Sequence, residues 1–384
     1  QIAGPTAAFA TIVAGIVAKN GLDGLVIATI LAGIFLILMG LCHFGTLIRF
    51  IPYTITTGFT AGIAVTIVIG QLKDFFGVTY PDGVKPIETM EKLHAFVENC
   101  GTVNLSAVIV GVVSLAILII SPYIFKKIPG SLLAVVAGIL MVKFLPLKAS
   151  TIGDLYSISN ALPGFHLPAL SFAAVEDAIP NAFTIAVLAA IESLLSCVVA
   201  DGMINGKHRS DMELVAQGAG NIASALFGGI PATGAIARTA ANIKNGGRTP
   251  IAGMVHSITL VLVLVVLMPY AGMIPMPTIA AILFVVAYNM CQWRPFTHLI
   301  QTAPKSDILV LLVTFFLTVV FDLVVAIEIG MLLTCLLFMK RMSDETHVDS
   351  WTYVDDDSDA VNDHMQKLAK EIRVYEITGP LFFG

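Results

Sequence analysis

The chain has 384 residues, of which 57% are hydrophobic and only 12% are charged, and its mean hydropathy is +0.89. Soluble domains carry about 25% charged residues, so this composition excludes an ordinary soluble protein and indicates one that lies largely in lipid. The formal net charge of −5 gives no sign of nucleic-acid binding. A chain of this length has room for about a dozen membrane spans of roughly 20 residues each.

Apolar segments recur along the first 342 residues, and polar stretches at 73–104 and 148–172 separate some of them. A short apolar segment opens the chain and runs to about residue 18. The longer predicted spans are 25–41, 54–72, 105–125, 132–145, 182–200, 213–227, 251–270, 277–290, 308–321 and 323–339.

Residues 229–242 are too short and too broken to cross a bilayer as one regular helix. They hold two glycines and Pro231, and then a run that can be helical from about Ala237, with Arg238 at its start. Irregular backbone at membrane depth is tolerated only where it is buried in protein or lines a cavity. Half-helices point their positive N-terminal ends at anions in transporters, so we predict an anion-binding half-helix here.

The first residues of the chain resemble that segment, because Gly4 and Pro5 open a run of small residues. Inverted repeats bring two such half-helices head to head, with unpaired N–H groups aimed at one site. We predict that the backbone amides of both segments bind an anion and that Arg238 supplies positive potential. The alternative is two kinked spans that pack through small residues. The predicted substrate-binding residues are Pro5, Thr6, Ala7, Ala8, Ala237, Arg238 and Thr239.

Glu192 lies in the middle of the span 182–200. A buried carboxylate must be paired or protonated, so Glu192 is predicted to bind a coupling proton or to be a static partner of Arg238. Ser196 follows at i+4 and faces the same side. Asp201 is nearer the end of the span and is expected to be a capping or loop carboxylate, and His208 is expected to be solvated.

No motif indicates bond-making catalysis. The sequence contains no zinc-ligand spacing, no GxSxG, no HExxH and no phosphate-binding loop, and its five cysteines include no CxxC pair. We therefore predict no enzyme activity, no metal and no cofactor.

The placement of Lys and Arg predicts the topology. One set of alternate loops is almost purely basic and includes Arg49, Lys207, Arg209 and Arg248, whereas the opposite set mixes Lys with Asp and Glu. The basic set should be cytoplasmic in a multi-pass inner-membrane protein. After the transmembrane domain (1–342), an acidic linker (343–370) is predicted to lead to a cytoplasmic β-hairpin at 371–384, with strands at 371–377 and 381–384.

Several motifs together resemble the SulP sulfate permease family. They are Gly-Pro-Thr-Ala-Ala-Phe at 4–9, Ile-Glu-Ser-Leu-Leu at 191–195, Glu-Leu-Val-Ala-Gln-Gly-Ala-Gly-Asn at 213–221 and the run 228–242. The resemblance covers essentially the whole chain, and the C-terminal residues look like the start of a STAS domain. It implies an all-α polytopic membrane protein with fourteen segments in two inverted repeats of seven, a core and a gate domain, and two short strand and half-helix segments. The third segment would start at Pro5 and the tenth at Ala237, so we expect both ends of the chain to be truncated and the first two segments to be missing.

The resemblance also implies a function. We expect a secondary active transporter, working by an elevator-like mechanism as a proton-coupled symporter of sulfate or a related small inorganic or dicarboxylate anion, and forming homodimers in the lipid bilayer. Some sodium-coupled relatives have an aspartate where this chain has Glu192, and Ser196 stands where they would use a hydroxyl, so sodium coupling stays open. Bicarbonate or C4-dicarboxylate transport, an anion channel and a non-transporting anion sensor stay open as well. A nucleobase carrier is disfavoured because Arg238 replaces the expected carboxylate.

Overall fold

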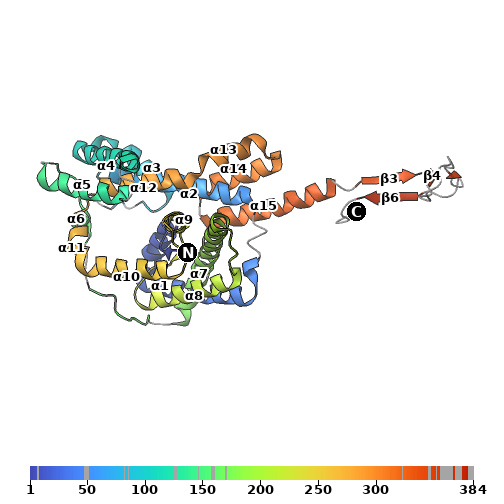
Figure 1. The fold of residues 1–384 in the computed structure, drawn as a ribbon, viewed down its shortest axis with the longest axis horizontal. Coiled ribbons are helices and arrows are strands. Elements are labelled where there is room, and N and C mark those ends of the chain that lie inside the picture. The colour runs from blue at the N-terminus through green and yellow to red at the C-terminus, as the bar shows by residue number, and fades with distance from the viewer. Residues whose placement is uncertain are drawn as a thin grey trace.

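The computed structural model describes the chain except for residues 7, 47–51, 82, 85, 125–127, 146, 157–160, 169–170, 322, 345–346, 352, 355–365, 368–373 and 379–384. The described part is mostly helical, which confirms the predicted all-α membrane fold class (Figure 1). Within it, six helical stretches are long and apolar enough to cross a membrane: Ile12–Leu41, Tyr53–Phe76, Leu105–Ile124, Phe172–Ile204, Ile251–Ala271 and Met276–Thr302. Further predicted spans form shorter helices, such as α5 (Gly130–Phe144), α8 (Ser210–Leu226) and α14 (Lys305–Val320).

One group of helices carries both segments that are predicted to bind the anion. Helix α1 (Phe9–Leu41) packs along α7 (Phe172–Ile204) and α8, and α7 also contacts the short helix α9 (Ile236–Lys244). Alanines with no exposed surface line the packing of this group, among them Ala28 of α1 and Ala186 of α7. Small side chains let these helices approach closely where lipid offers no hydrophobic drive to association.

A second group packs around α2 (Tyr53–Phe76). This helix contacts α12 (Met276–Cys291) and α14, α12 contacts α4 (Leu105–Ile124) and α5, and α14 contacts α15 (Leu323–Asp344). Phe59 and Ile63 of α2 share a buried cluster with Phe9 of α1, so the two groups meet through a common apolar core. The remaining helical elements are α3 (Thr89–Glu98), the 3₁₀ turn η2 (Cys100–Thr102), α6 (Ile152–Leu155), α10 (Ile251–Leu262), the π-helix η3 (Val263–Leu267), α11 (Met268–Ala271) and α13 (Trp293–Thr302).

Two predicted boundaries differ from the structure. The short segment at the start of the chain and the span 25–41 form one helix, α1, which bends at Gly21, where φ is 70°. Helix α7 begins at Phe172, ten residues before the predicted span at 182, because Ser171 Oγ caps it by accepting from Ala174 N at 3.2 Å. Each difference comes from a local backbone feature that hydropathy does not report.

The C-terminal strands lie beyond the end of α15 (Figure 1). Strand β6 (Val374–Thr378) falls at the predicted strand 371–377, but it pairs antiparallel with β3 (His347–Trp351). Strand β4 (Tyr353–Val354) pairs with β5 (Gln366–Lys367). The expected hairpin partner at 381–384 lies outside the described residues, and strands occupy part of the range 343–370 that was predicted to be a linker. Pairing between distant strands explains this, since strand partners cannot be read from local alternation.

Candidate functional site

A two-stranded antiparallel ladder joins the two predicted half-helix segments. Strand β1 (Ala3–Gly4) pairs with β2 (Thr233–Gly234), with Ala3 opposite Gly234. Ala235 N continues the ladder by donating to Ile2 O at 3.0 Å. A helix follows each strand, α1 after β1 and α9 after β2. Because the strands are antiparallel, the helices leave the ladder in opposite directions and their N-terminal ends face back toward it.

Neither of these helices has a capped start. The residue before α1 is Ala8 and the residue before α9 is Ala235, and neither provides a side-chain cap. The first turn of each helix contains no acidic residue. The first N–H groups of a helix have no intrahelical acceptor and carry partial positive charge, so both ends are suited to an anion.

Arg238 adds a full positive charge beside the ladder. Its Nη2 donates to Pro5 O, so a residue of α9 contacts the segment that leads into α1. Gly4 makes room for it, since a Cβ on Gly4 would lie 2.8 Å from Arg238 Nη1. Among the described ion pairs, none joins Arg238 to a carboxylate. The alternative in which Glu192 is the static partner of Arg238 therefore has no supporting ion pair among the described residues.

Glu192 contacts the same site through a hydroxyl. Its side chain is 6% exposed, and its Oε2 accepts a hydrogen bond from Thr6 Oγ1 at 2.9 Å. Ser196, one turn further along α7, donates from Oγ to Thr239 Oγ1 at 3.0 Å, and Thr239 Oγ1 also accepts from Ile2 N at 3.1 Å. The predicted coupling residues thus contact the predicted substrate segments directly.

The structure places the predicted site residues as three contacting pairs: Thr6 with Glu192, Thr239 with Ser196, and Pro5 with Arg238. Ala8 is buried at the start of α1, and Ala237 is exposed in the first turn of α9. Ala7 lies outside the described residues.

Sequence reasoning missed a polar network beside this site. Ser193 Oγ accepts from Gln1 Nε2 at 2.8 Å and donates to Glu213 Oε1 at 3.1 Å, and Gln217 Nε2 donates to the same carboxylate oxygen at 3.1 Å. A signal was present, because Glu213, Gln217 and Asn221 are spaced i, i+4, i+8 and form one polar stripe on α8. The network ties α8 to α7 and, through Ser193, to Gln1, two residues before β1.

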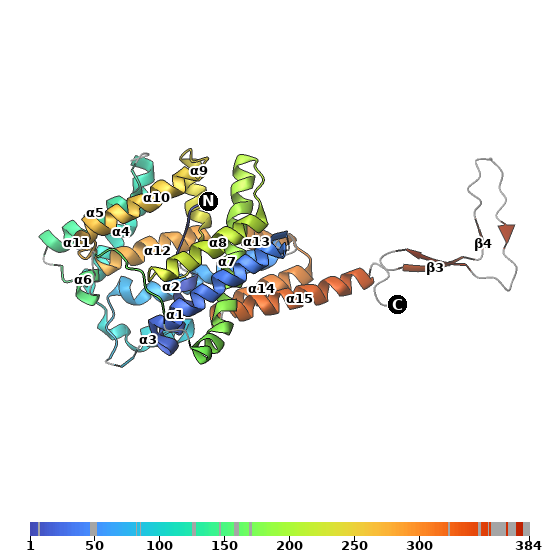
Figure 2. The same cartoon turned by 90° about the horizontal axis from the view of Figure 1, so that it is seen from below.

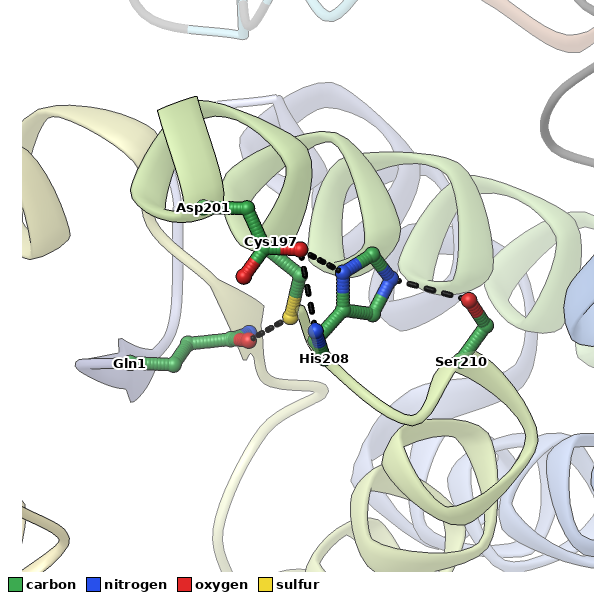
Figure 3. A network of polar contacts seen from close by, with 5 residues as sticks. All are labelled: Gln1, Cys197, Asp201, His208 and Ser210. Carbon is green, nitrogen blue, oxygen red and sulfur yellow. Dashed lines mark hydrogen bonds and ion pairs between the residues drawn. The ribbon is translucent and has the colours of Figure 1, made fainter. Parts of the chain in front are cut away.

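A second network closes the turn between α7 and α8 (Figure 3). Asp201 Oδ2 accepts from the backbone N of His208 at 2.9 Å and lies 2.7 Å from its Nδ1, while His208 Nε2 lies 2.9 Å from Ser210 Oγ. Asp201 lies in the last turn of α7 and accepts from the backbone of the loop that follows, as expected of a capping or loop carboxylate. The expectation that His208 is solvated is wrong, since its side chain is only 19% exposed. The cause is the turn, which folds the imidazole against Asp201. Near this turn, Cys197 Sγ contacts Gln1 Oε1 at 2.7 Å (Figure 3).

No set of three or more His, Cys, Asp or Glu side chains is arranged to hold a metal in the part of the chain that the structure describes. Long apolar helices, a two-stranded ladder whose β2 strand is buried, and two facing, uncapped helix starts define a multi-pass membrane transporter fold.

The comparison with known proteins assigns the family. A family model described as Sulfate permease family matches residues 1–314, so the chain belongs to that family. It is 41% identical over 394 residues to a Putative sulfate transporter YvdB of Bacillus subtilis (strain 168), and the match covers 100% of this chain and 71% of that protein. It is 32% identical over 372 residues to a Bicarbonate transporter BicA of Picosynechococcus sp. (strain ATCC 27264 / PCC 7002 / PR-6), covering 94% of this chain and 65% of that protein.

A solved structure supports the same family assignment. The transmembrane domain of a cyanobacterium bicarbonate transporter BicA superposes with a TM-score of 0.73 at 29% identity, and the match covers 85% of this chain and 83% of that chain. The family and these relatives are transporters, which confirms the prediction that the protein is not an enzyme.

Proposed function

We propose that the protein is a secondary active transporter that carries sulfate or a related small anion together with a proton. The supporting observation is the β1–β2 ladder, which is flanked by two uncapped helix starts and by Arg238 without a carboxylate partner among the described ion pairs. Such a site offers N–H donors and positive charge to an oxyanion, and its contacts are mostly backbone. The relatives named sulfate and bicarbonate transporters support a small oxyanion as the substrate class.

Glu192 would carry the coupling proton. It is buried, and its described contact is a neutral hydroxyl rather than a cation. A negative charge so close to the anion site opposes anion binding, and protonation removes that opposition. By linkage, anion and proton then each favour the binding of the other, which is the thermodynamic requirement for symport.

The mechanism would move the first helix group, which holds the site, against the group around α2 in an elevator-like step. The site itself would stay intact, because its hydrogen bonds join the segment that leads into α1 with α7 and α9, all within one group. The basic loops would face the cytoplasm, as would the C-terminal strands, which would form part of a STAS domain that supports homodimers.

Reconstitution of the full-length protein in proteoliposomes tests the proposal. Uptake of labelled sulfate, bicarbonate and fumarate is measured with and without an inward proton or sodium gradient. We expect sulfate to accumulate when the inside is alkaline. Bicarbonate accumulation would instead support the alternative that the bicarbonate-transporting relatives suggest. Sodium dependence would make sodium, rather than a proton, the coupling ion at Glu192 and Ser196. Anion currents that depend on neither the proton nor the sodium gradient would indicate a channel. The absence of flux for all three anions would contradict the proposal.

A further inference from the structure

Asn221 joins α8 to the segment that leads into β2. Its side chain is 1% exposed. Its Oδ1 accepts from Ala232 N at 2.8 Å, and its Nδ2 donates both to Ala232 O at 2.8 Å and to Gln217 O at 2.8 Å. The amide therefore pairs with both backbone groups of Ala232, as a neighbouring strand would.

Ala232 needs such a partner because the ladder stops short of it. The β1–β2 register pairs only Thr233 and Gly234 with β1. An unpaired N–H and C=O at membrane depth would be costly. Within β2, Thr233 Oγ1 also donates to Ala189 O of α7 at 2.9 Å. The strand is thus held from α8 through Asn221 and from α7 through Thr233.

The stripe on α8 that contains Asn221 is also linked, through Ser193 of α7, to Gln1 near the start of β1. Glu213 lies on it two turns before Asn221, accepts from Ser193 Oγ, and Ser193 in turn accepts from Gln1 Nε2. Gln1 lies two residues before β1. One face of α8 therefore contacts the segment that enters β2 directly, through Asn221, and is linked to the start of the β1 segment through Ser193 of α7.

We propose that Asn221 is a positioning residue for anion binding. It fixes Ala232, and through β2 it sets the position of the first N–H groups of α9 and of Arg238. This inference rests on the proposed function, in which those groups bind the anion. Loss of a buried hydrogen-bonded amide should then raise the KM for the anion by about ten-fold or more. The maximal rate should change much less, because Asn221 contacts no helix of the second group among its described hydrogen bonds.

The experiment compares Asn221→Ala and Asn221→Asp with wild type in the full-length protein, using labelled sulfate uptake into proteoliposomes. In Asn221→Asp a carboxylate oxygen replaces Nδ2 and faces two carbonyl oxygens. It repels them when charged and can donate one hydrogen bond when protonated. We expect its KM to approach the wild-type value as the pH is lowered, whereas the KM of Asn221→Ala relative to wild type stays constant.

The titratable and charged groups around this position, Glu192 of α7, Glu213 of α8 and Arg238 of α9, are the same in all variants. The ratio of variant to wild-type KM at each pH therefore reports on residue 221. Asn245→Asp is the matched control, because the exposed Asn245 Nδ2 donates to Ala241 O at 2.8 Å at the far end of α9. It should follow wild type at every pH.

The inference is overturned if both Asn221 variants keep the wild-type KM, or if they lose only folded protein or maximal rate with no recovery at acid pH. If Asn221→Ala cannot be purified, the test uses Asn221→Asp alone. Its KM at acid pH and the rise in its melting temperature on addition of sulfate are then compared with those of wild type. If wild type transports none of the anions, the proposed function fails and this inference fails with it. If wild type transports and the variants match it, only the role of Asn221 is wrong.

Discussion

Two opposite charges lie within the candidate site without forming a pair. Glu192 accepts from Thr6, and Arg238 donates to Pro5 O. A direct ion pair would neutralise both groups and leave little potential for a ligand. These separate partners are consistent with the proposed roles, in which Glu192 binds a proton and Arg238 an anion, and each role can be tested by one substitution.

Replacing Glu192 with Gln should abolish accumulation driven by a pH gradient while exchange of internal for external anion continues. The amide keeps an oxygen that accepts from Thr6 but takes up no proton. Gradient-driven uptake and counterflow are measured in the same proteoliposomes. Gradient-driven accumulation that persists in Glu192→Gln would remove the coupling role from this residue.

Replacing Arg238 with Ala should lower anion uptake at least about ten-fold, since a charge-assisted contact in a partly buried site is worth roughly 1.5–3 kcal/mol. Arg248→Ala is the matched control. Arg248 lies beyond the far end of α9, where its Nη1 donates to Ile243 O and Gly247 O, each at 2.9 Å. Equal losses in the two variants would show that helix stability rather than site charge is being measured.

At the scale of the elements, the close approach of α1 and α8 is what holds the site-bearing group together. A Cβ on Gly33 of α1 would lie 2.7 Å from Gly218 O and 2.6 Å from Ile222 Cγ1. The helices therefore meet backbone to backbone, and a single methyl group would force them apart.

Gly33→Ala should destabilise the protein by about 1–3 kcal/mol through overpacking. Gly70→Ala on α2 is the matched control, because nothing lies within 4 Å of its added Cβ. It should be neutral or slightly stabilising. The melting temperatures of the two purified variants make the comparison, and a Gly33→Ala protein as stable as Gly70→Ala would show that α1 and α8 pack more loosely than described.

At the scale of the whole molecule, α3 and α9 lie at opposite sides of the helical body (Figure 2). That arrangement agrees with the alternation of basic and mixed-charge loops. Lys244 at the end of α9 belongs to the basic set, together with the loop after α7, whereas α3 belongs to the mixed-charge set. The positive-inside rule then puts the loop after α7 in the cytoplasm.

A cysteine introduced at the exposed Glu98 of α3 should react with a membrane-impermeant maleimide in intact cells, and one at the exposed Lys207 should react only after the cells are opened. The exposed native cysteines Cys42, Cys100 and Cys335 are replaced by Ser beforehand. The reverse pattern would invert the proposed topology and place the basic loops outside.

The sequence by itself determined the membrane class, the family and the two broken segments, because lipid requires long apolar helices and marks any break or charge in them. It also located Glu192 and Arg238, since an ionisable residue in an apolar span is visible without coordinates. Only the tertiary structure decided which of these groups meet. The pairing of Ala3 with Gly234 and the contact of Thr6 with Glu192 join segments far apart in the chain, and the contact of Asn221 with Ala232 joins a helix to the extended segment that follows it. Hydropathy reports only where a residue lies in the bilayer, whereas hydrogen-bond partners depend on helix rotation and register, which packing sets.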